Sequence, residues 1–175
     1  MKKNLTVHTG STSLKSDDHS IHKVVNIHYD TRDDFSDDCR SALILEVDHP
    51  FDFTKDSIQP VPLALPHKDI KSDSVAEILN WDFESKHNQL RAIYVTGIDK
   101  HCKSYNVDYQ NTIEDCKFDC IPNFKKNATV ALGAPYLIDD KQAGFVLDSV
   151  DRSGAVLMIE NLKFSRKFIE RFSKQ

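Results

Sequence analysis

The sequence has no uninterrupted apolar stretch close to the roughly 20 residues that a membrane-spanning helix requires. It also has no basic segment, because the net charge is -4 and the cationic residues are mixed with acids along the chain. These absences predict neither a membrane anchor nor a nucleic-acid partner. The segment 1–15 continues with polar residues after Lys2 and Lys3, so it lacks the apolar core of a signal peptide. Either the protein is intracellular, or residue 1 is not the natural start of the parent domain.

Metal-binding cysteine motifs are missing as well. No two cysteines form a C-x-x-C pair, and no histidine pair follows them at zinc-finger spacing. His19 and His22 are spaced like ligands on one helical turn, but the residues around them show no apolar helical face. The sequence therefore predicts no metal and no cofactor.

A disulfide is a better use for at least two of the four cysteines, and this favours an oxidising compartment. Two glycosylation triplets agree with that compartment, since such sites are used in secreted proteins. They begin at Asn4 and Asn127.

Short apolar runs separated by turn residues predict a β-rich fold. The segment 42–47 is almost continuously apolar and has the length of a strand, which is typical of a strand buried on both faces. The Asp-His-Pro sequence at 48–50 then signals a turn. Further strands are expected at 24–27, 90–95, 134–138, 144–147 and 155–159. Short strands at this spacing favour an antiparallel barrel or sandwich.

Two other segments have a different pattern. The stretch 59–66 contains three prolines, which lack N–H donors and have fixed φ, so it is expected to be an extended connector. Near the C-terminus, Phe164, Phe168, Ile169 and Phe172 recur at helical spacing. Ser165 is a candidate N-cap of that helix. The helix either packs onto its own barrel or contacts a membrane or a partner's groove.

The most specific pattern in the chain is segment 41–64, S-A-L-I-L-E-V-D-H-P-F-D-F-T-K-D-S-I-Q-P-V-P-L-A. It resembles the trypsin-like (chymotrypsin-fold, peptidase S1) serine proteases, whose pattern is D-I-A-L-L-K-L, a proline turn, and F-T-x-x-I-Q-P-V-x-L-P. Upstream, segments 7–10 and 26–28 resemble the family's V-x-L-G and I-x-H-P. Downstream, segment 133–137 resembles G-G-P-L-V, and segment 164–172 matches the closing helix.

The resemblance implies an all-β, chymotrypsin-like double antiparallel β-barrel with a C-terminal α-helix. The N-terminal barrel is expected over 1–66, and the C-terminal barrel with its helix over 67–175. The family's T-A-A-H-C segment would precede residue 7, so the first barrel is expected to be incomplete and the homologue N-terminally truncated. The low glycine count and the L-G-A-P sequence at 132–135 also resemble divergent trypsin-like proteins of nematodes.

The same resemblance implies a pairing of the cysteines. Cys102 and Cys116 resemble the ends of the family's C-x-x-x-Y…I…C disulfide loop. Cys39 and Cys120 are then left over, and we take a bond between them as a hypothesis.

The resemblance further implies that catalysis is lost. The family's nucleophile lies in G-D-S-G-G-P, and the aligned stretch 130–135 has Leu132 at that position. Leucine has no lone pair with which to attack a carbonyl. Ser41 stands at the position of the triad carboxylate, and the family's histidine segment is absent. His8 and His28 lie on segments that match other parts of the family pattern, so neither is expected to replace that histidine.

These features predict a pseudoprotease that acts as a binding or regulatory protein, with no partner identified by the sequence. The family implies an extracellular location. Two alternatives remain open: an active S1 endopeptidase that uses non-standard residues, and a truncated fragment without independent function.

Overall fold

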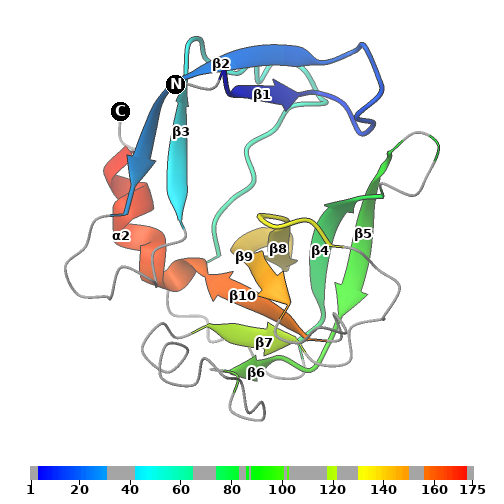
Figure 1. The fold of residues 1–175 in the computed structure, drawn as a ribbon, viewed down its shortest axis with the longest axis vertical. Coiled ribbons are helices and arrows are strands. Elements are labelled where there is room, and N and C mark those ends of the chain that lie inside the picture. The colour runs from blue at the N-terminus through cyan, green and yellow to red at the C-terminus, as the bar shows by residue number, and fades with distance from the viewer. Residues whose placement is uncertain are drawn as a thin grey trace.

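The computed structural model describes residues 4–30, 42–64, 74–82, 86, 88–100, 102, 118–121, 130–149 and 156–172. Within these ranges the chain forms two antiparallel sheets and a C-terminal helix (Figure 1). The smaller sheet has the order β1-β2-β3, with β1 at Thr6–Thr9, β2 at Ser20–Tyr29 and β3 at Leu43–Val47. The expected β-rich fold with a closing helix is confirmed.

The larger sheet has the order β5-β4-β8-β9-β10-β7-β6. Its strands are β4 (Ala76–Trp81), β5 (Leu90–Val95), β6 (Asp99–Lys100), β7 (Asp119–Ile121), β8 (Pro135–Ile138), β9 (Lys141–Ser149) and β10 (Leu157–Asn161). Its neighbouring strands pair antiparallel throughout. The predicted domain boundary at 66/67 lies outside the described residues, so the division into 1–66 and 67–175 stays a prediction.

The main core lies in the larger sheet and depends on the two-residue period of its strands. In β4, Ala76, Ile78 and Asn80 are buried while the residues between them are half-buried. Ile78 is opposite Tyr136 of β8, and both are almost completely buried. Burial of Tyr136, together with the negative charge of Asp119, raises the pKa of that phenol well above its usual value. Aliphatic side chains from the other strands complete the cluster.

β3 is less buried than its sequence predicts. The apolar run at 42–47 does form a strand, but it lies at one edge of the three-stranded order and pairs only with β2 among the described strands. Leu43 is 50% exposed and Glu46 is also exposed. The expectation of a strand buried on both faces is therefore wrong, because a run of apolar residues does not reveal how many layers cover it.

The proline-rich segment is a connector, as expected, and it crosses from the smaller sheet to β9. Gln142 of β9 donates its backbone N–H to the carbonyl of Pro62, at 2.9 Å. Ala64 in turn donates its N–H to the carbonyl of Gln142, also at 2.9 Å. Arg166 of the C-terminal helix donates to the carbonyl of Ala64 at 2.7 Å. These contacts fix the connector against the larger sheet.

The C-terminal helix, α2, spans Leu162–Phe172 and packs against the rest of the chain. Phe168 is buried, and the ring of Phe172 lies 4.4 Å from that of His28 on β2. Asn161, not Ser165, caps the helix, because its Oδ1 accepts the N–H of Lys163 at 2.9 Å. Ser165 lies inside the helix, where its hydroxyl donates to Glu160 at 2.9 Å. No helix among the described residues is long and apolar enough to cross a membrane.

The described disulfide corrects the expected pairing. Cys102 is bonded to Cys120, not to Cys116, so Cys120 is not available to Cys39. The physical reason is strand register: β6 pairs with β7, which places Asp99 opposite Cys120. The chain then brings Cys102 to a Cα–Cα distance of 4.9 Å from Cys120, well within the range for a bond. Cys39 and Cys116 lie outside the described residues.

We predict that Cys102→Ser lowers the free energy of unfolding by about 2–4 kcal/mol, because the unfolded chain loses a loop constraint. Urea unfolding with and without reductant measures this change. A digest of the unreduced protein should contain a peptide that joins Cys102 to Cys120 and that separates on reduction. A peptide that joins Cys102 to Cys116 instead would contradict the register argument.

We predict a clear loss of stability for Gly144→Ala. A Cβ at Gly144 would collide with the backbone carbonyl of Glu160 and approach Cγ2 of Ile159 to 2.9 Å. Because β9 and β10 are paired there, the strands must separate, at a cost of about 1–3 kcal/mol. Chemical denaturation measures the difference. Lys141→Ala, at an exposed position on the same strand, is the control and should change stability by less than about 0.5 kcal/mol.

Candidate functional site

The turn that leads into β8 is the position at which the resemblance places a nucleophile. Ala134 donates its N–H to the carbonyl of Ala131 at 3.1 Å, which closes the turn. Gly133 donates to the carbonyl of Val146 at 2.8 Å, and Val146 donates back to Ala134 at 2.9 Å. Gly133 has a φ of 80°, a left-handed conformation that suits glycine. Backbone hydrogen bonds therefore hold the turn against β9.

A buried amide anchors the turn from the other side. Asn80 lies on β4 and is only 5% exposed. Its Oδ1 accepts the N–H of Ala131 at 2.9 Å, while its Nδ2 donates to the carbonyl of Trp81 at 3.1 Å. The side chain thus connects the turn to β4 of the larger sheet.

Leu132 lies at this turn and is 71% exposed. An aliphatic side chain offers neither a lone pair nor a proton, so this residue cannot form an acyl intermediate. The other position expected to be degenerate, Ser41, lies outside the described residues. Asn127 does as well, whereas Asn4 is described and exposed, so glycosylation at both remains a prediction.

His8 and His28, the histidines considered as substitute bases, are engaged elsewhere. Nε2 of His28 lies 3.0 Å from a carboxylate oxygen of Glu46, its neighbour across the β2–β3 pair. The ring of His8 stacks on that of His19 with centroids 4.6 Å apart. Nε2 of His8 lies 3.2 Å from the hydroxyl of Thr6. None of these three contacts involves the turn at Leu132.

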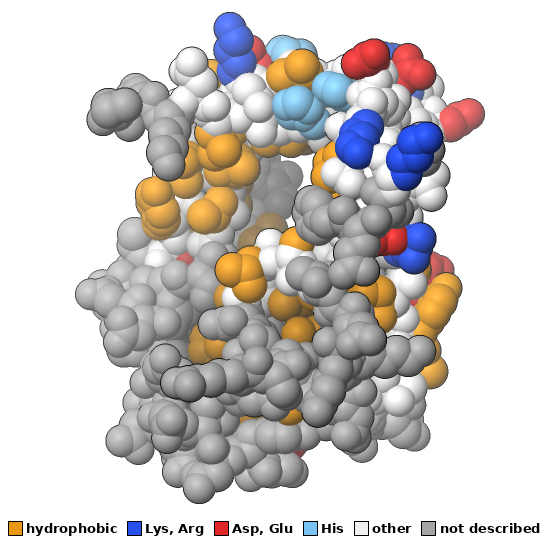
Figure 2. All heavy atoms as spheres, turned by 45° about the vertical axis from the view of Figure 1, so that its right-hand side comes forward, with side chains coloured by type: hydrophobic (Ala, Val, Ile, Leu, Met, Phe, Trp, Pro, Cys, Tyr) orange, Lys and Arg blue, Asp and Glu red, His pale blue; other side chains and the backbone are white. Residues whose placement is uncertain are grey.

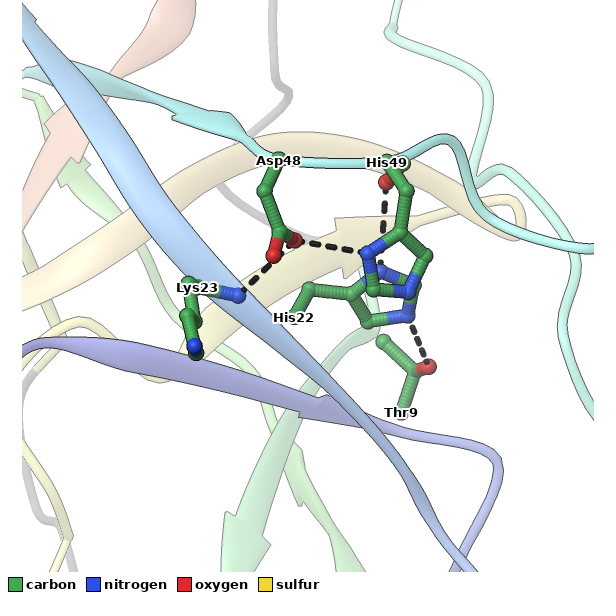
Figure 3. A network of polar contacts seen from close by, with 5 residues as sticks. All are labelled: Thr9, His22, Lys23, Asp48 and His49. Carbon is green, nitrogen blue, oxygen red and sulfur yellow. Dashed lines mark hydrogen bonds and ion pairs between the residues drawn. The ribbon is translucent and has the colours of Figure 1, made fainter.

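The smaller sheet contains a polar cluster that the sequence did not predict: His22, Asp48 and His49 (Figure 3). His22 lies on β2 and is 2% exposed, whereas Asp48 and His49 follow β3 and are exposed. The rings of His22 and His49 stack with centroids 4.2 Å apart. Phe51 lies edge-on to His22 at 4.7 Å. Figure 2 shows histidine side chains gathered on the surface at this end of the molecule.

Asp48 is held in place by the backbone of β2. Its N–H donates to the carbonyl of Lys23 at 2.9 Å, and its Oδ1 accepts the N–H of Lys23 at 3.0 Å. The same oxygen lies 2.7 Å from Nδ1 of His49. Desolvation alone would raise the pKa of Asp48, but the hydrogen bonds from Lys23 and His49 and the charge of His49 outweigh it and lower the pKa. Asp48 is therefore a carboxylate at neutral pH.

The sequence contained weak signals for this cluster. His19 and His22 have the spacing of ligands on one helical turn, but the sequence around them gave no helical face and no metal was predicted. His22 in fact lies on a strand, and Asp48-His49 was interpreted only as part of a turn. His22 and His49 are 27 positions apart, and only the β2–β3 register brings them together.

Comparison with known proteins shows the fold. No protein-family model matches the chain, and no curated protein matches it by sequence. Solved structures do match: GrC has a TM-score of 0.78 and 16% identity, over 100% of this chain and 80% of that one. A mutant of human heparin binding protein has a TM-score of 0.72 and 11% identity, over 97% and 77% of the two chains. The scabies mite inactivated protease paralogue S-I1 has a TM-score of 0.72 and 15% identity, over 97% and 76%.

These matches cover nearly the whole chain, and they are with members of the trypsin-like group of chymotrypsin-fold proteins. The chain therefore has the chymotrypsin-like fold, as segment 41–64 implied. At identities of 11–16% they establish the fold and not the activity.

We predict that Asn80→Ala destabilises the protein, because the N–H of Ala131 loses its acceptor in a partly buried site. An unsatisfied donor of this kind costs about 1–3 kcal/mol, which thermal or urea unfolding measures. Leu132→Ala alters the same turn at an exposed side chain and is the matched control, with an expected change below about 0.5 kcal/mol. Equal effects of the two substitutions would show that Asn80 does not anchor the turn.

Proposed function

We propose that this chain is a protease homologue that does not cleave peptides and that acts as a binding or regulatory protein. The observation that carries the proposal is Leu132, an exposed aliphatic residue at the turn before β8. In the trypsin-like pattern that turn carries the nucleophile, and acyl transfer requires a nucleophilic atom there.

The contacts that hold the turn are consistent with a protein that keeps its fold after losing a catalytic side chain. The turn is fixed by Gly133, Ala134 and Val146 through backbone groups, and by Asn80 through its amide. None of these contacts uses the side chain of Leu132, so the nucleophile position is free to change while the fold is kept.

The structural neighbours support the same reading. Two of them are scabies mite inactivated protease paralogues, and others are forms of a heparin binding protein. Proteins named for loss of protease activity or for binding thus share this fold at TM-scores of 0.70–0.73. Heparin itself is not proposed as a ligand here, because a net charge of -4 does not favour a polyanion.

The proposal includes an extracellular location, which the bond between Cys102 and Cys120 supports, since disulfides persist in oxidising compartments. It also includes the two units expected from the sequence, one over 1–66 and one over 67–175. The binding surface is proposed to include the exposed Leu132.

A serine-directed fluorophosphonate probe tests the proposal. We predict that the purified protein is not labelled under conditions in which trypsin is labelled completely, because Leu132 has no nucleophilic atom. Leu132→Ser is the matched variant, and it should also remain unlabelled, because neither His8 nor His28 contacts this turn and a serine without a base is a weak nucleophile. Covalent labelling of the unaltered chain would overturn the proposal and identify an active hydrolase with non-standard residues.

A further inference from the structure

The cluster of His22, Asp48 and His49 has the composition of a metal site. Each residue supplies one ligand atom, and these three atoms lie within 4.8 Å of one another. Two imidazoles and a carboxylate are a ligand set that binds zinc and other borderline divalent metals in proteins. The set is independent of the turn at Leu132, which belongs to the other sheet.

His22 can supply a ligand nitrogen to the cluster. Figure 3 shows its Nδ1 on the side of Asp48 and His49, where it lies 3.2 Å from the carbonyl oxygen of His49, a long contact that a metal ion can replace. Its Nε2 points the other way, toward the hydroxyl of Thr9 at 3.4 Å. A hydroxyl oxygen can accept a hydrogen bond, so Nε2 carries the hydrogen when Nδ1 holds the metal. A hydrogen bond from the other ring nitrogen is the usual support of a metal-bound histidine.

The other two ligands, Asp48 and His49, come from the turn that follows β3. The backbone of Lys23 fixes Asp48 through two hydrogen bonds, which places the carboxylate beside β2. The side chain of His49 pairs with Asp48 and stacks on the ring of His22, but it is 54% exposed, so solvent leaves it room to adjust. Ligand atoms around a tetrahedral zinc ion are about 3.4 Å apart, given Zn–N and Zn–O distances of about 2.1 Å. The three ligand atoms lie within 4.8 Å of one another, so closing the cluster to that size takes a movement of about 1–1.5 Å.

We propose that His22, Asp48 and His49 bind one divalent transition-metal ion of the zinc type. Solvent fills the fourth position, because Asp48 and His49 are exposed. The ion joins β2 to the turn that follows β3, so its binding also stabilises the smaller sheet.

A neighbouring pair of histidines provides an internal control. His8 and His19 also stack, with centroids 4.6 Å apart, and they lie at the same end of the chain. Nδ1 of His19 lies 2.7 Å from the carbonyl of Ser16, and the pair is not part of a described cluster of three metal-ligating side chains. Removing His8 therefore subtracts an exposed imidazole without removing a proposed ligand.

The test is calorimetric titration of the full chain with zinc chloride, with the visible absorption of bound cobalt(II) as a second readout. We predict one equivalent of zinc per chain. His49→Ala and Asp48→Asn each weaken binding at least tenfold, and His8→Ala leaves the affinity unchanged. The substituted positions are exposed, so the variants should fold, and circular dichroism checks this.

Three results would overturn the proposal. One is the absence of saturable zinc binding by the full chain. Another is an affinity that either His49→Ala or Asp48→Asn leaves unchanged. The third is loss of binding in His8→Ala, which would place the ion at the other histidine pair. Labelling by the fluorophosphonate probe bears on the turn at Leu132 only, so the two proposals fail or hold separately.

Discussion

The backbone pairing of β9 is the interaction on which the larger part of the structure depends. Along this strand, Gln142 bonds to the connector, Gly144 lies against β10, and Val146 holds the turn before β8. Gly144 permits the close approach of β10 because it has no Cβ. One strand thus aligns the connector, the neighbouring strands and the turn at Leu132.

The shape of the turn before β8 does not depend on the side chain at position 132. The turn before β8 takes its shape from backbone N–H and carbonyl groups and from the amide of Asn80. Backbone groups are present whatever the side chain, so these hydrogen bonds of the turn do not depend on which side chain stands at position 132. The proposed absence of a nucleophile at this position is therefore compatible with an intact turn.

Sequence patterns predicted the elements better than their environments. The strand at 90–95 was predicted with its observed bounds, and 134–138 with a difference of one residue, because apolar periodicity reflects local burial. β4 was not predicted as a strand, since its core face includes a polar Asn80, whose partner Ala131 is 51 positions away. The bond between Cys102 and Cys120 was also not predicted. It depends on the register of β6 and β7, and the spacing of cysteines along the sequence does not reveal that register.

The cluster of His22, Asp48 and His49 could not be predicted from the sequence, because strand pairing brings its residues together. His22 alone is a buried polar residue on a strand, and Asp48-His49 alone is a turn. They come together only because the β2–β3 pair ends at Val24 and Val47, which leaves the backbone of Lys23 beside Asp48 to hold it. Its ligand atoms come from the smaller sheet and the turn that follows it, whereas Leu132 is aligned by β9. Since the two regions share no described side-chain contact, substitutions in one should leave the properties of the other nearly unchanged.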